Sequence, residues 1–208
     1  MAEESTPTDP RLALERELRA CVEAGELERA ATLAVTSYGP ELLGYLQAMG
    51  RDDDVASEAF AITCEQLWKH LARFRWDASL RTWLYQVGRN ALFRLRRNPG
   101  HRDDRNVPLS LVTSIAAVQR QSTAIYQRTE SKNALRELRE ALDPADHELL
   151  LLRLDRGMSW KDIARATAGE ELSATALTSR AATLRKRYER VKLELRQKAI
   201  AAGLLEER

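Results

Sequence analysis

The stretch that decides the fold class is LRTWLYQVGRNALFRLRR, residues 80–97. Its apolar residues recur at every third or fourth position, which places them on one face of an α-helix; they are Leu80, Leu84, Val87, Ala91 and Leu95. The pattern ends at Asn98-Pro99-Gly100, a combination that breaks helices. Sustained alternation of apolar and polar residues, the signature of a strand, occurs nowhere in the chain. The sequence therefore predicts an all-α protein.

Further helices are expected on the N-terminal side of this stretch. Residues 11–35 carry a helical pattern that Gly25 bends or breaks, and a short apolar face follows over residues 42–50. The acidic triplet Asp52-Asp53-Asp54 then stands where carboxylates cap free amides and suit the dipole of a new helix. Together these patterns predict a first small helical domain over residues 11–98.

The helix that begins at the acidic triplet carries one apolar stripe. Its members recur at helical spacing and are Phe60, Cys64, Leu67, Trp68 and Leu71. A stripe of this kind is ordinarily the side of a helix that faces the core. We therefore expect Trp68 to be buried.

A change of composition separates this domain from the rest of the chain. Residues 99–130 are polar and mixed, with one weak helical stretch over residues 111–118, and we interpret them as a linker. A second small helical domain is expected over residues 131–198. Residues 1–10 are expected to be a disordered leader and residues 199–208 a C-terminal tail.

Four helices are predicted in the second domain. The first covers residues 134–142, and Asp143-Pro144 begins the next, because Asp caps a helix and Pro suits its first position. Ser159 and Asp162 resemble a capping box that begins a short helix. After a turn containing Gly169 comes a final long helix, whose apolar side carries Leu177, Ala181, Leu184, Tyr188, Val191 and Leu195.

The position of the charges is more informative than their sum. The 33 Lys and Arg residues against 31 Asp and Glu residues leave a net charge of only +2. Within residues 69–97, however, Asp77 is the only acid, and within residues 180–192 the only acid is Glu189. Two separate basic segments favour two contacts with a polyanion. Either segment alone is also typical of a solvated helix face.

Several classes of protein are disfavoured. Two cysteines, Cys21 and Cys64, do not make a disulfide framework and are expected to be reduced, buried thiols. No apolar run approaches the length of a membrane span, and the N-terminus lacks the features of a signal peptide, so a cytoplasmic location without membrane insertion is expected. His70, His101 and His147 lack metal-ligand spacing, and no glycine-rich phosphate loop is present. We therefore expect no catalytic, metal or cofactor site, which leaves a small nuclease or metal hydrolase as a disfavoured alternative.

Both basic segments carry features that suit DNA. A short helix, a turn and a long amphipathic helix form a helix-turn-helix pattern, whose second helix enters the major groove. On that helix small polar residues suit base edges, and Arg and Lys suit phosphates. In the first segment, aromatic residues alternate with arginines around Trp76 and Trp83, a combination that can stack unpaired bases and hold their backbone. Aromatic residues on helices are also common in cores, so Trp83 is assigned to neither role at this point.

Two blocks of sequence resemble the extracytoplasmic-function (ECF, group 4) sigma factors of the sigma-70 family. Four segments resemble conserved region 2 of that family. They are the run Asp54-Val55-Ala56-Ser57-Glu58 through Leu67-Trp68, then Phe74, then Leu80-Arg81-Thr82-Trp83-Leu84, and Gly88-Arg89-Asn90-Ala91. Residues 134–195 resemble region 4 of the same family. Within them, residues 142–154, 159–164 and 177–180 match the helix-turn-helix pattern of region 4. The blocks stand in the order and at the separation of that family, and together they cover most of residues 11–195.

The resemblance implies a bacterial promoter-specificity subunit that is not an enzyme. Core RNA polymerase would be bound at the clamp helices of its largest subunit by Asp54, Glu58, Ile62, Glu65 and Gln66. The −10 promoter element, as single-stranded DNA with a flipped base, would be bound by Phe74, Arg75, Trp76, Ser79, Arg81, Trp83, Asn90, Arg94 and Arg97. The −35 element, as duplex, would be bound by Thr178, Ser179, Arg180, Ala182, Thr183, Lys186 and Arg187. An anti-sigma factor is a possible further partner.

The sequence departs from the family pattern at several positions. Ala61 stands where the family usually has Gln, and Arg94 replaces a common Asp. The turn over residues 168–172 is about three residues longer than is typical, and Ala176 and Thr183 replace a usual Thr and a common Arg. These departures leave the promoter sequence open. The alternative is a helix-turn-helix regulator that binds duplex DNA without polymerase, which would leave the acidic helix and the aromatic loop unexplained.

Overall fold

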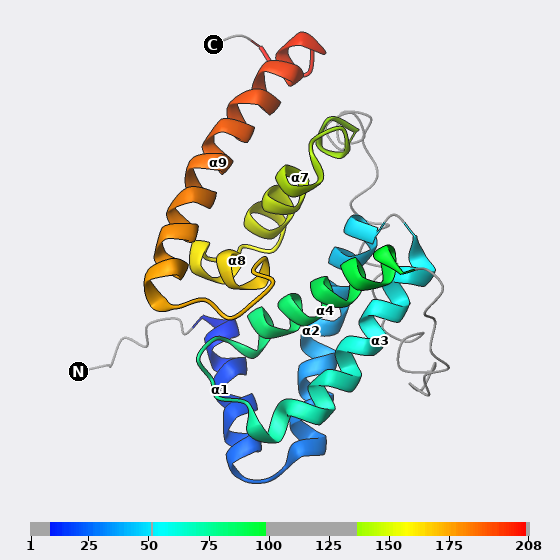
Figure 1. Cartoon of the computed structure of the whole chain (residues 1–208), viewed down its shortest axis with the longest axis vertical. Helices are drawn as coiled ribbons and strands as arrows, with labels where there is room; N and C mark the ends of the chain where they lie inside the picture. The colour runs from blue at the N-terminus through cyan, green and yellow to red at the C-terminus, as the bar shows by residue number, and fades with distance from the viewer. Residues whose placement is uncertain (1–8, 51, 99–136, 207–208) are drawn as a thin grey trace, which may run out of the picture.

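The computed structural model of the chain describes residues 9–50, 52–98 and 137–206 (Figure 1). These residues form helices joined by turns, with no strand among them, so the predicted all-α class is confirmed. Within these ranges no helix combines the length and the apolar character needed to cross a membrane. The predicted linker, including its weak helical stretch over residues 111–118, lies outside the described residues.

Four helices form the N-terminal group: α1 Pro10–Glu23, α2 Leu27–Gly50, α3 Asp53–His70 and α4 Leu80–Arg97, with a 3₁₀ turn at Leu71–Arg73 after α3. Gly25, with a φ of 77°, separates α1 from α2, as predicted from the sequence. The helical pattern up to residue 35 and the apolar face over residues 42–50 belong to one helix, because α2 runs without interruption through Pro40. A buried face on both sides of the proline holds the helix together.

The C-terminal group contains α7 Pro144–Leu150, a π-helical turn at Leu151–Asp155, α8 Trp160–Ala166 and α9 Ala174–Ala201. The two predicted starts are confirmed. The Asp143 carboxylate accepts from the amide of Ala145, with Pro144 in the first helical position, and the Ser159 hydroxyl accepts from the amide of Asp162. Of the helix expected over residues 134–142, residues 137–140 are helical and residues 134–136 lie outside the described residues.

Most of the buried apolar side chains of the two groups form one continuous cluster. Tyr45, Tyr85 and Phe60 are its largest fully buried members in the N-terminal group, and Leu149–Leu152 and Ile163 join it from the C-terminal group. Helix α4 lies between α3 on one side and α8 on the other (Figure 1). The position of α4 is therefore central, because it contributes to the core and faces the C-terminal group at the same time.

The expectation that Trp68 is buried is wrong. Its side chain is 60% exposed, whereas the neighbouring Leu67 is 1% exposed. Consecutive residues of a helix lie about 100° apart, so only one of two adjacent apolar residues can face the core directly. Helix α3 turns Phe60 and Leu67 toward α2 and α4, and Trp68 is left on the solvent side.

Candidate nucleic-acid interface

The start of α4 is fixed by two side chains from different parts of the sequence. The Ser79 hydroxyl accepts from the amide of Thr82 at 3.1 Å. The carboxylate of Glu15, on α1, accepts from the amides of Leu80 at 2.8 Å and Arg81 at 3.1 Å. The first amides of a helix have no partner within the helix, so both contacts satisfy groups that would otherwise be unpaired. The loop that leads into α4 is therefore held from both sides.

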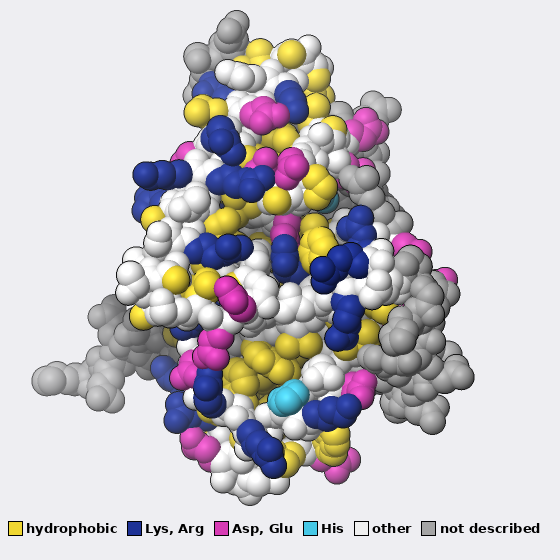
Figure 2. Space-filling view, in the orientation of Figure 1, with side chains coloured by type: hydrophobic (Ala, Val, Ile, Leu, Met, Phe, Trp, Pro, Cys, Tyr) yellow, Lys and Arg dark blue, Asp and Glu magenta, His cyan; other side chains and the backbone are white. Residues whose placement is uncertain are grey.

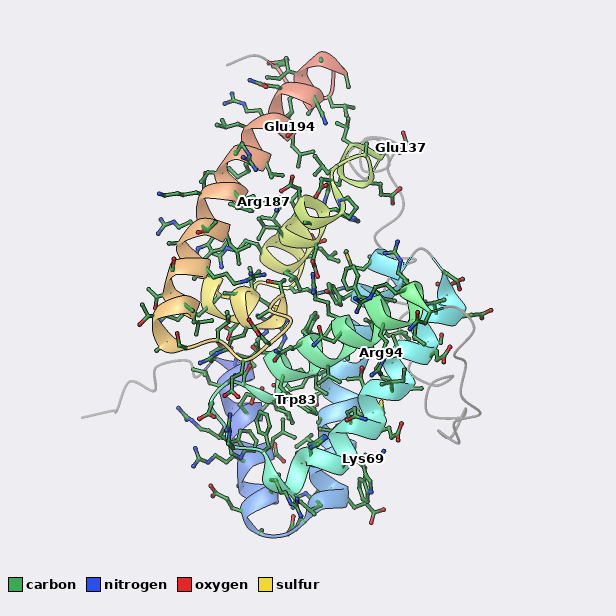
Figure 3. The ribbon with its side chains drawn as sticks, in the orientation of Figure 1. Lys69, Trp83, Arg94, Glu137, Arg187 and Glu194 are labelled. Atoms are coloured by element: carbon green, nitrogen blue, oxygen red, sulfur yellow. The ribbon has the colours of Figure 1, made fainter. Side chains whose placement is uncertain are left out.

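Aromatic rings gather in and beside this loop. The ring of Phe74 lies 5.0 Å from Trp76 and 5.8 Å from Trp83, and His70 lies 6.3 Å from Trp83, all edge to face. Trp76 has a φ of 60°, a left-handed conformation that is strained for a bulky residue. Phe74, Trp76 and Trp83 are partly exposed. These rings therefore pack on one another at the edge of the core and are not enclosed by it. Figure 3 shows the position of Trp83 on α4.

A cavity of about 780 Å³ opens at these rings. Figure 2 shows exposed hydrophobic side chains in a hollow of this face, with Lys and Arg side chains near its margin. The cations of its lining come from both groups of helices and are Arg73, Arg75, Lys161 and Arg165. Asn90 adds an amide, and Glu170 and Glu171 add carboxylates from the turn between α8 and α9. Stacking surfaces, cations and a hydrogen-bonding amide are what a single-stranded base and its phosphate require.

The residues expected at the −10 element divide into two sets. Asn90, Arg94 and Arg97 are exposed on α4, and Phe74, Arg75, Trp76 and Trp83 line the cavity. Ser79 caps α4 and is partly buried. Arg81 is only 7% exposed and binds the Glu41 carboxylate at 2.5 and 3.0 Å, so its expected direct contact with DNA is not possible in this arrangement. Burial lowers the pKa of Arg81, but the hydrogen bonds and charge of Glu41 raise it above its ordinary value.

The residues expected to bind polymerase lie along α3. Asp54 is exposed, and Glu58, Glu65 and Gln66 are partly exposed. Ile62, which was also expected to contact polymerase, is 2% exposed and belongs to the core in this structure. Trp68 lies on the face of Asp54, Glu58 and Glu65, since Glu58, Glu65 and Trp68 each lie within about 40° of Asp54 around the helix axis. Trp68 was not among the residues expected to bind polymerase, because its place in the apolar stripe predicted that it would be buried.

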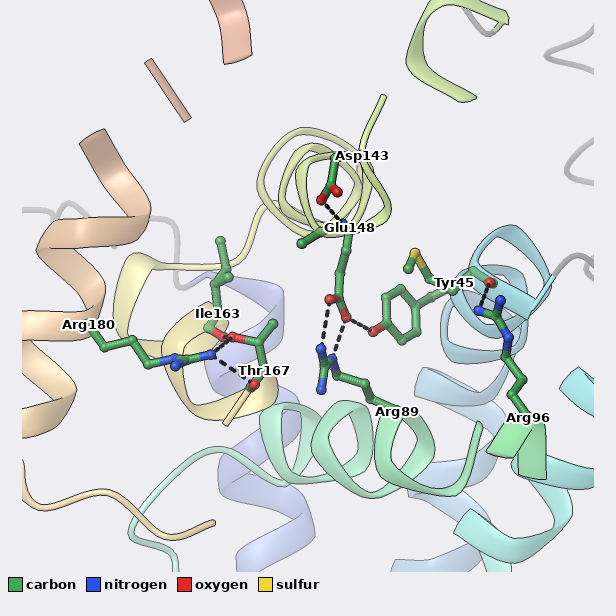
Figure 4. Close-up of polar contacts among 10 residues, drawn as sticks. Tyr45, Arg89, Arg96, Asp143, Glu148, Ile163, Thr167 and Arg180 are labelled. Atoms are coloured by element: carbon green, nitrogen blue, oxygen red, sulfur yellow. Dashed lines mark hydrogen bonds and ion pairs between the residues drawn. The ribbon is translucent and has the colours of Figure 1, made fainter. Parts of the chain in front are cut away.

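The N-terminal half of α9 presents an exposed polar face. The residues expected at the −35 element that lie exposed there are Thr178, Ser179, Arg180, Ala182, Thr183 and Lys186. Arg180 also donates to the carbonyl and hydroxyl of Thr167, which holds the turn after α8 against α9 (Figure 4). Arg187 is partly buried and binds Asp146 and Asp143, so in this structure it joins α9 to α7.

Helices α8 and α9 pack through a small apolar cluster and an aromatic pair. Ala164 of α8 meets Leu177 and Ala181 of α9, and the ring of Trp160 lies 5.3 Å from that of Tyr188. Among the described residues, no group of three or more His, Cys, Asp and Glu residues could hold a metal ion.

Comparison with known families assigns the N-terminal part of the chain. Residues 34–101 match the family model described as Sigma-70 region 2. The match covers most of α2, all of α3 and α4, and the loop that carries the aromatic rings. No curated protein and no solved structure gave a significant match. Residues 34–101 are therefore similar to region 2 of the sigma-70 family, whose proteins are transcription initiation factors, not enzymes.

Proposed function

We propose that this protein is an ECF-type sigma factor, a cytoplasmic subunit that binds core RNA polymerase and directs it to promoters with a −10 and a −35 element. The observation that carries the proposal is the region 2 match together with the aromatic and cationic cavity at the start of α4. In this proposal the two parts of the chain recognise two forms of DNA.

The −10 element is bound as single-stranded DNA at the cavity. Phe74, Trp76 and Trp83 offer ring faces and edges to an unstacked base, and Arg75 and Asn90 lie beside them. Opening one base-pair step costs about 1–2 kcal/mol in stacking. Capture of the released base lowers the free energy of the melted state, and no catalytic residue is required.

The −35 element is bound as duplex by α9, which acts as the recognition helix of a helix-turn-helix with α8. Thr178, Ser179 and Thr183 provide short polar groups for base edges, and Lys186 provides a charge for phosphate. Core polymerase is bound by the acidic face of α3, where Asp54, Glu58 and Glu65 surround a position occupied by Ala61. We add Trp68 to this face, since aromatic residues at the centre of an interface often contribute most to binding.

The proposal is tested by run-off transcription with core polymerase on a library of promoter sequences. We expect initiation at a defined pair of elements, and sequence-independent initiation, or none in the absence of an inhibitor, would contradict the proposal. Asp54→Lys should weaken pull-down of core polymerase by at least about tenfold, because it reverses a charge on the docking face.

Asp53→Lys is the matched control for that variant. Asp53 lies in the same first turn of α3 and is also exposed, but it points about 100° away from Asp54. The two variants disturb the helix dipole equally. A difference in polymerase binding between them therefore shows that the face of α3 that carries Asp54 contacts polymerase. A protein that binds duplex DNA without polymerase, the alternative function, would show no difference.

A further inference from the structure

We propose that Glu15, on α1, is a positioning residue for recognition of the −10 element, because its carboxylate sets the geometry of the aromatic rings that capture the base. The inference rests on the proposed function, since it concerns the −10 site assigned above. It adds to that site a helix that supplies none of the described residues lining the cavity and ends before the region 2 match begins.

The Glu15 carboxylate is held in place by the N-terminal group. The hydroxyl of Tyr38, on α2, is part of a side chain that is only 4% exposed, and it donates to this carboxylate at 2.8 Å. Burial, followed by the charge of Glu15, raises the pKa of Tyr38, so the hydroxyl keeps its proton and remains a donor. Leu18, on the same helix as Glu15, is fully buried in the core. The position of the carboxylate is therefore set by α1 and α2 and not by the loop that it binds.

Both oxygens of this carboxylate bind the first turn of α4. One accepts from the amide of Leu80 at 2.8 Å and the other from the amide of Arg81 at 3.1 Å. A negative charge at the positive end of a helix strengthens such bonds. The guanidinium of Arg81 is bound in turn by Glu41, on α2, at 3.0 Å. The first turn of α4 is therefore anchored to α1 and α2.

This anchored turn carries one of the rings and ends the loop that carries the others. Trp83 belongs to the turn, and its amide donates to the carbonyl of Ser79 at 3.2 Å. Trp76, in the loop, has a φ of 60°, a conformation that persists in a bulky residue only when the surrounding structure over-determines it. Because Glu15 holds the point where the loop enters α4, a shift at this point would displace Trp83 and relax Trp76 together.

Capture of a base depends on such small displacements. The ring of Phe74 lies 5.0 Å from that of Trp76 and 5.8 Å from that of Trp83. A gap of about 0.5–1 Å between two surfaces already removes about a quarter to a half of their dispersion attraction. Loss of the Glu15 anchor should therefore weaken the capture of a base in a domain that is still folded.

The first test measures the affinity of the polymerase complex for single-stranded DNA. The probe is a fluorescent oligonucleotide with the non-template sequence of the −10 element found by run-off transcription, and in a second set each base in turn is replaced by an abasic site. The captured base is the one whose loss weakens binding most, by about 5- to 150-fold if it stacks on the rings. Glu15→Ala should reduce this ratio at least about threefold and leave affinity for the abasic probe within about twofold, since that probe lacks the base.

The second test compares initiation on two forms of one promoter. One form is fully paired, and the other has an unpaired −10 element. Opening one base-pair step costs the equivalent of about 5- to 30-fold in an equilibrium constant, and capture of the base offsets this cost only where the DNA has to be opened. Glu15→Ala should therefore lower initiation at least about fivefold on the paired promoter and less than about twofold on the unpaired one. A smaller amount of folded protein would lower both equally.

Three further variants complete the series. Glu15→Gln keeps one acceptor oxygen and should give intermediate effects, which keeps the test decisive if Glu15→Ala does not fold. Tyr38→Phe removes the donor that holds the carboxylate and should act in the same direction to a smaller extent. Glu17→Ala is the matched control and should change neither measurement, because Glu17 is exposed on the same helix and pairs with Arg29 at 3.7 Å.

Two results would overturn the inference. One is an unchanged ratio between the complete and abasic probes in Glu15→Gln and in folded Glu15→Ala. The other is an equal loss on the two probes, or on the two promoters, because it would assign Glu15 to stability alone. Neither result would affect the proposed function, which depends on promoter-specific initiation by the natural chain with core polymerase.

Discussion

The carboxylate of Glu15 accepts a 2.8 Å hydrogen bond from the amide of Leu80, 65 residues further along the chain. The same carboxylate accepts from the amide of Arg81 and from the hydroxyl of Tyr38, so α1 caps α4 from outside. Helix α1 lies outside the region 2 match, which begins at residue 34. Its contact with α4 nevertheless sets the position of the aromatic loop.

Removing this cap should destabilise the N-terminal group. Glu15→Ala leaves two helix amides and the Tyr38 hydroxyl without their acceptor, so the free energy of unfolding should fall by about 2–3 kcal/mol. Glu15→Gln keeps an oxygen acceptor without the charge and should lower it by about 1 kcal/mol. Urea unfolding followed by circular dichroism measures both. Glu17→Ala is the control, since Glu17 lies two residues away and is exposed, and equal losses in Glu15→Ala and Glu17→Ala would contradict the capping role.

The exposed Trp68 should matter for binding and not for folding. Trp68→Ala should change the free energy of unfolding by less than about 0.5 kcal/mol, as is usual for a surface residue. Leu67→Ala, one position earlier and fully buried, should lower it by about 2–5 kcal/mol through the cavity that it leaves. Thermal unfolding of the two variants makes this comparison. In pull-down of core polymerase Trp68→Ala should retain clearly less than the natural chain, and an unchanged amount would remove Trp68 from the docking face.

Much of the local structure could be predicted from the sequence, because its causes are local. The spacing of Leu80 to Leu95 gave α4 its observed bounds, and the caps at Asp143 and Ser159 depend on residues two or three positions away. Pro40 shows the limit of such reasoning. A proline usually interrupts a helix, but the burial of α2 on both sides of it depends on helices packed from elsewhere in the chain.

The contacts between the two groups could not be predicted in this way. Glu148 and Arg89 are 59 residues apart in sequence, and nothing in either neighbourhood distinguishes them from solvated charges. Arg81 was expected near the −10 element because the resemblance to region 2 implied it, yet its guanidinium is held by the Glu41 carboxylate and the Arg156 carbonyl. An ion pair of this kind depends on how helices dock, and periodicity contains no information about docking.

The charge of Lys186 should contribute to binding of the −35 duplex through a phosphate. Each phosphate contact steepens the dependence of log affinity on log salt concentration by about 0.9. Lys186→Ala should therefore reduce this slope by about one and weaken binding similarly for all duplex sequences. Fluorescence anisotropy of the polymerase complex on a −35 duplex, over a series of salt concentrations, measures the slope. Lys198→Ala is the matched control near the far end of α9. An equal change of slope in Lys198→Ala would mean that Lys186 acts through the long-range attraction of its charge and not through contact with a phosphate.

The thiol of Cys64 should react slowly with alkylating agents in the folded chain. Burial raises its pKa from the ordinary value of 9.0 to about 12, because the thiolate is poorly solvated between helices. The thiol form is the more stable one in the folded state, so its contribution to stability is fully present below pH 9 and is lost as the pH rises toward 12.

A shift of this size lowers the thiolate fraction near pH 8 by about 1,000-fold, and alkylation by iodoacetamide should be slower than in urea by a comparable factor. Mass spectrometry of the peptides distinguishes Cys64, which is partly buried, from Cys21, which is also free and is fully buried. The rate at Cys64 should increase about tenfold for each unit of pH while the helices stay folded, because only the thiolate reacts. Rapid alkylation at pH 8 would mean that α3 leaves its neighbours on the timescale of the reaction. The acidic face and Trp68 would then belong to a mobile helix, which would contradict their arrangement as a rigid docking surface.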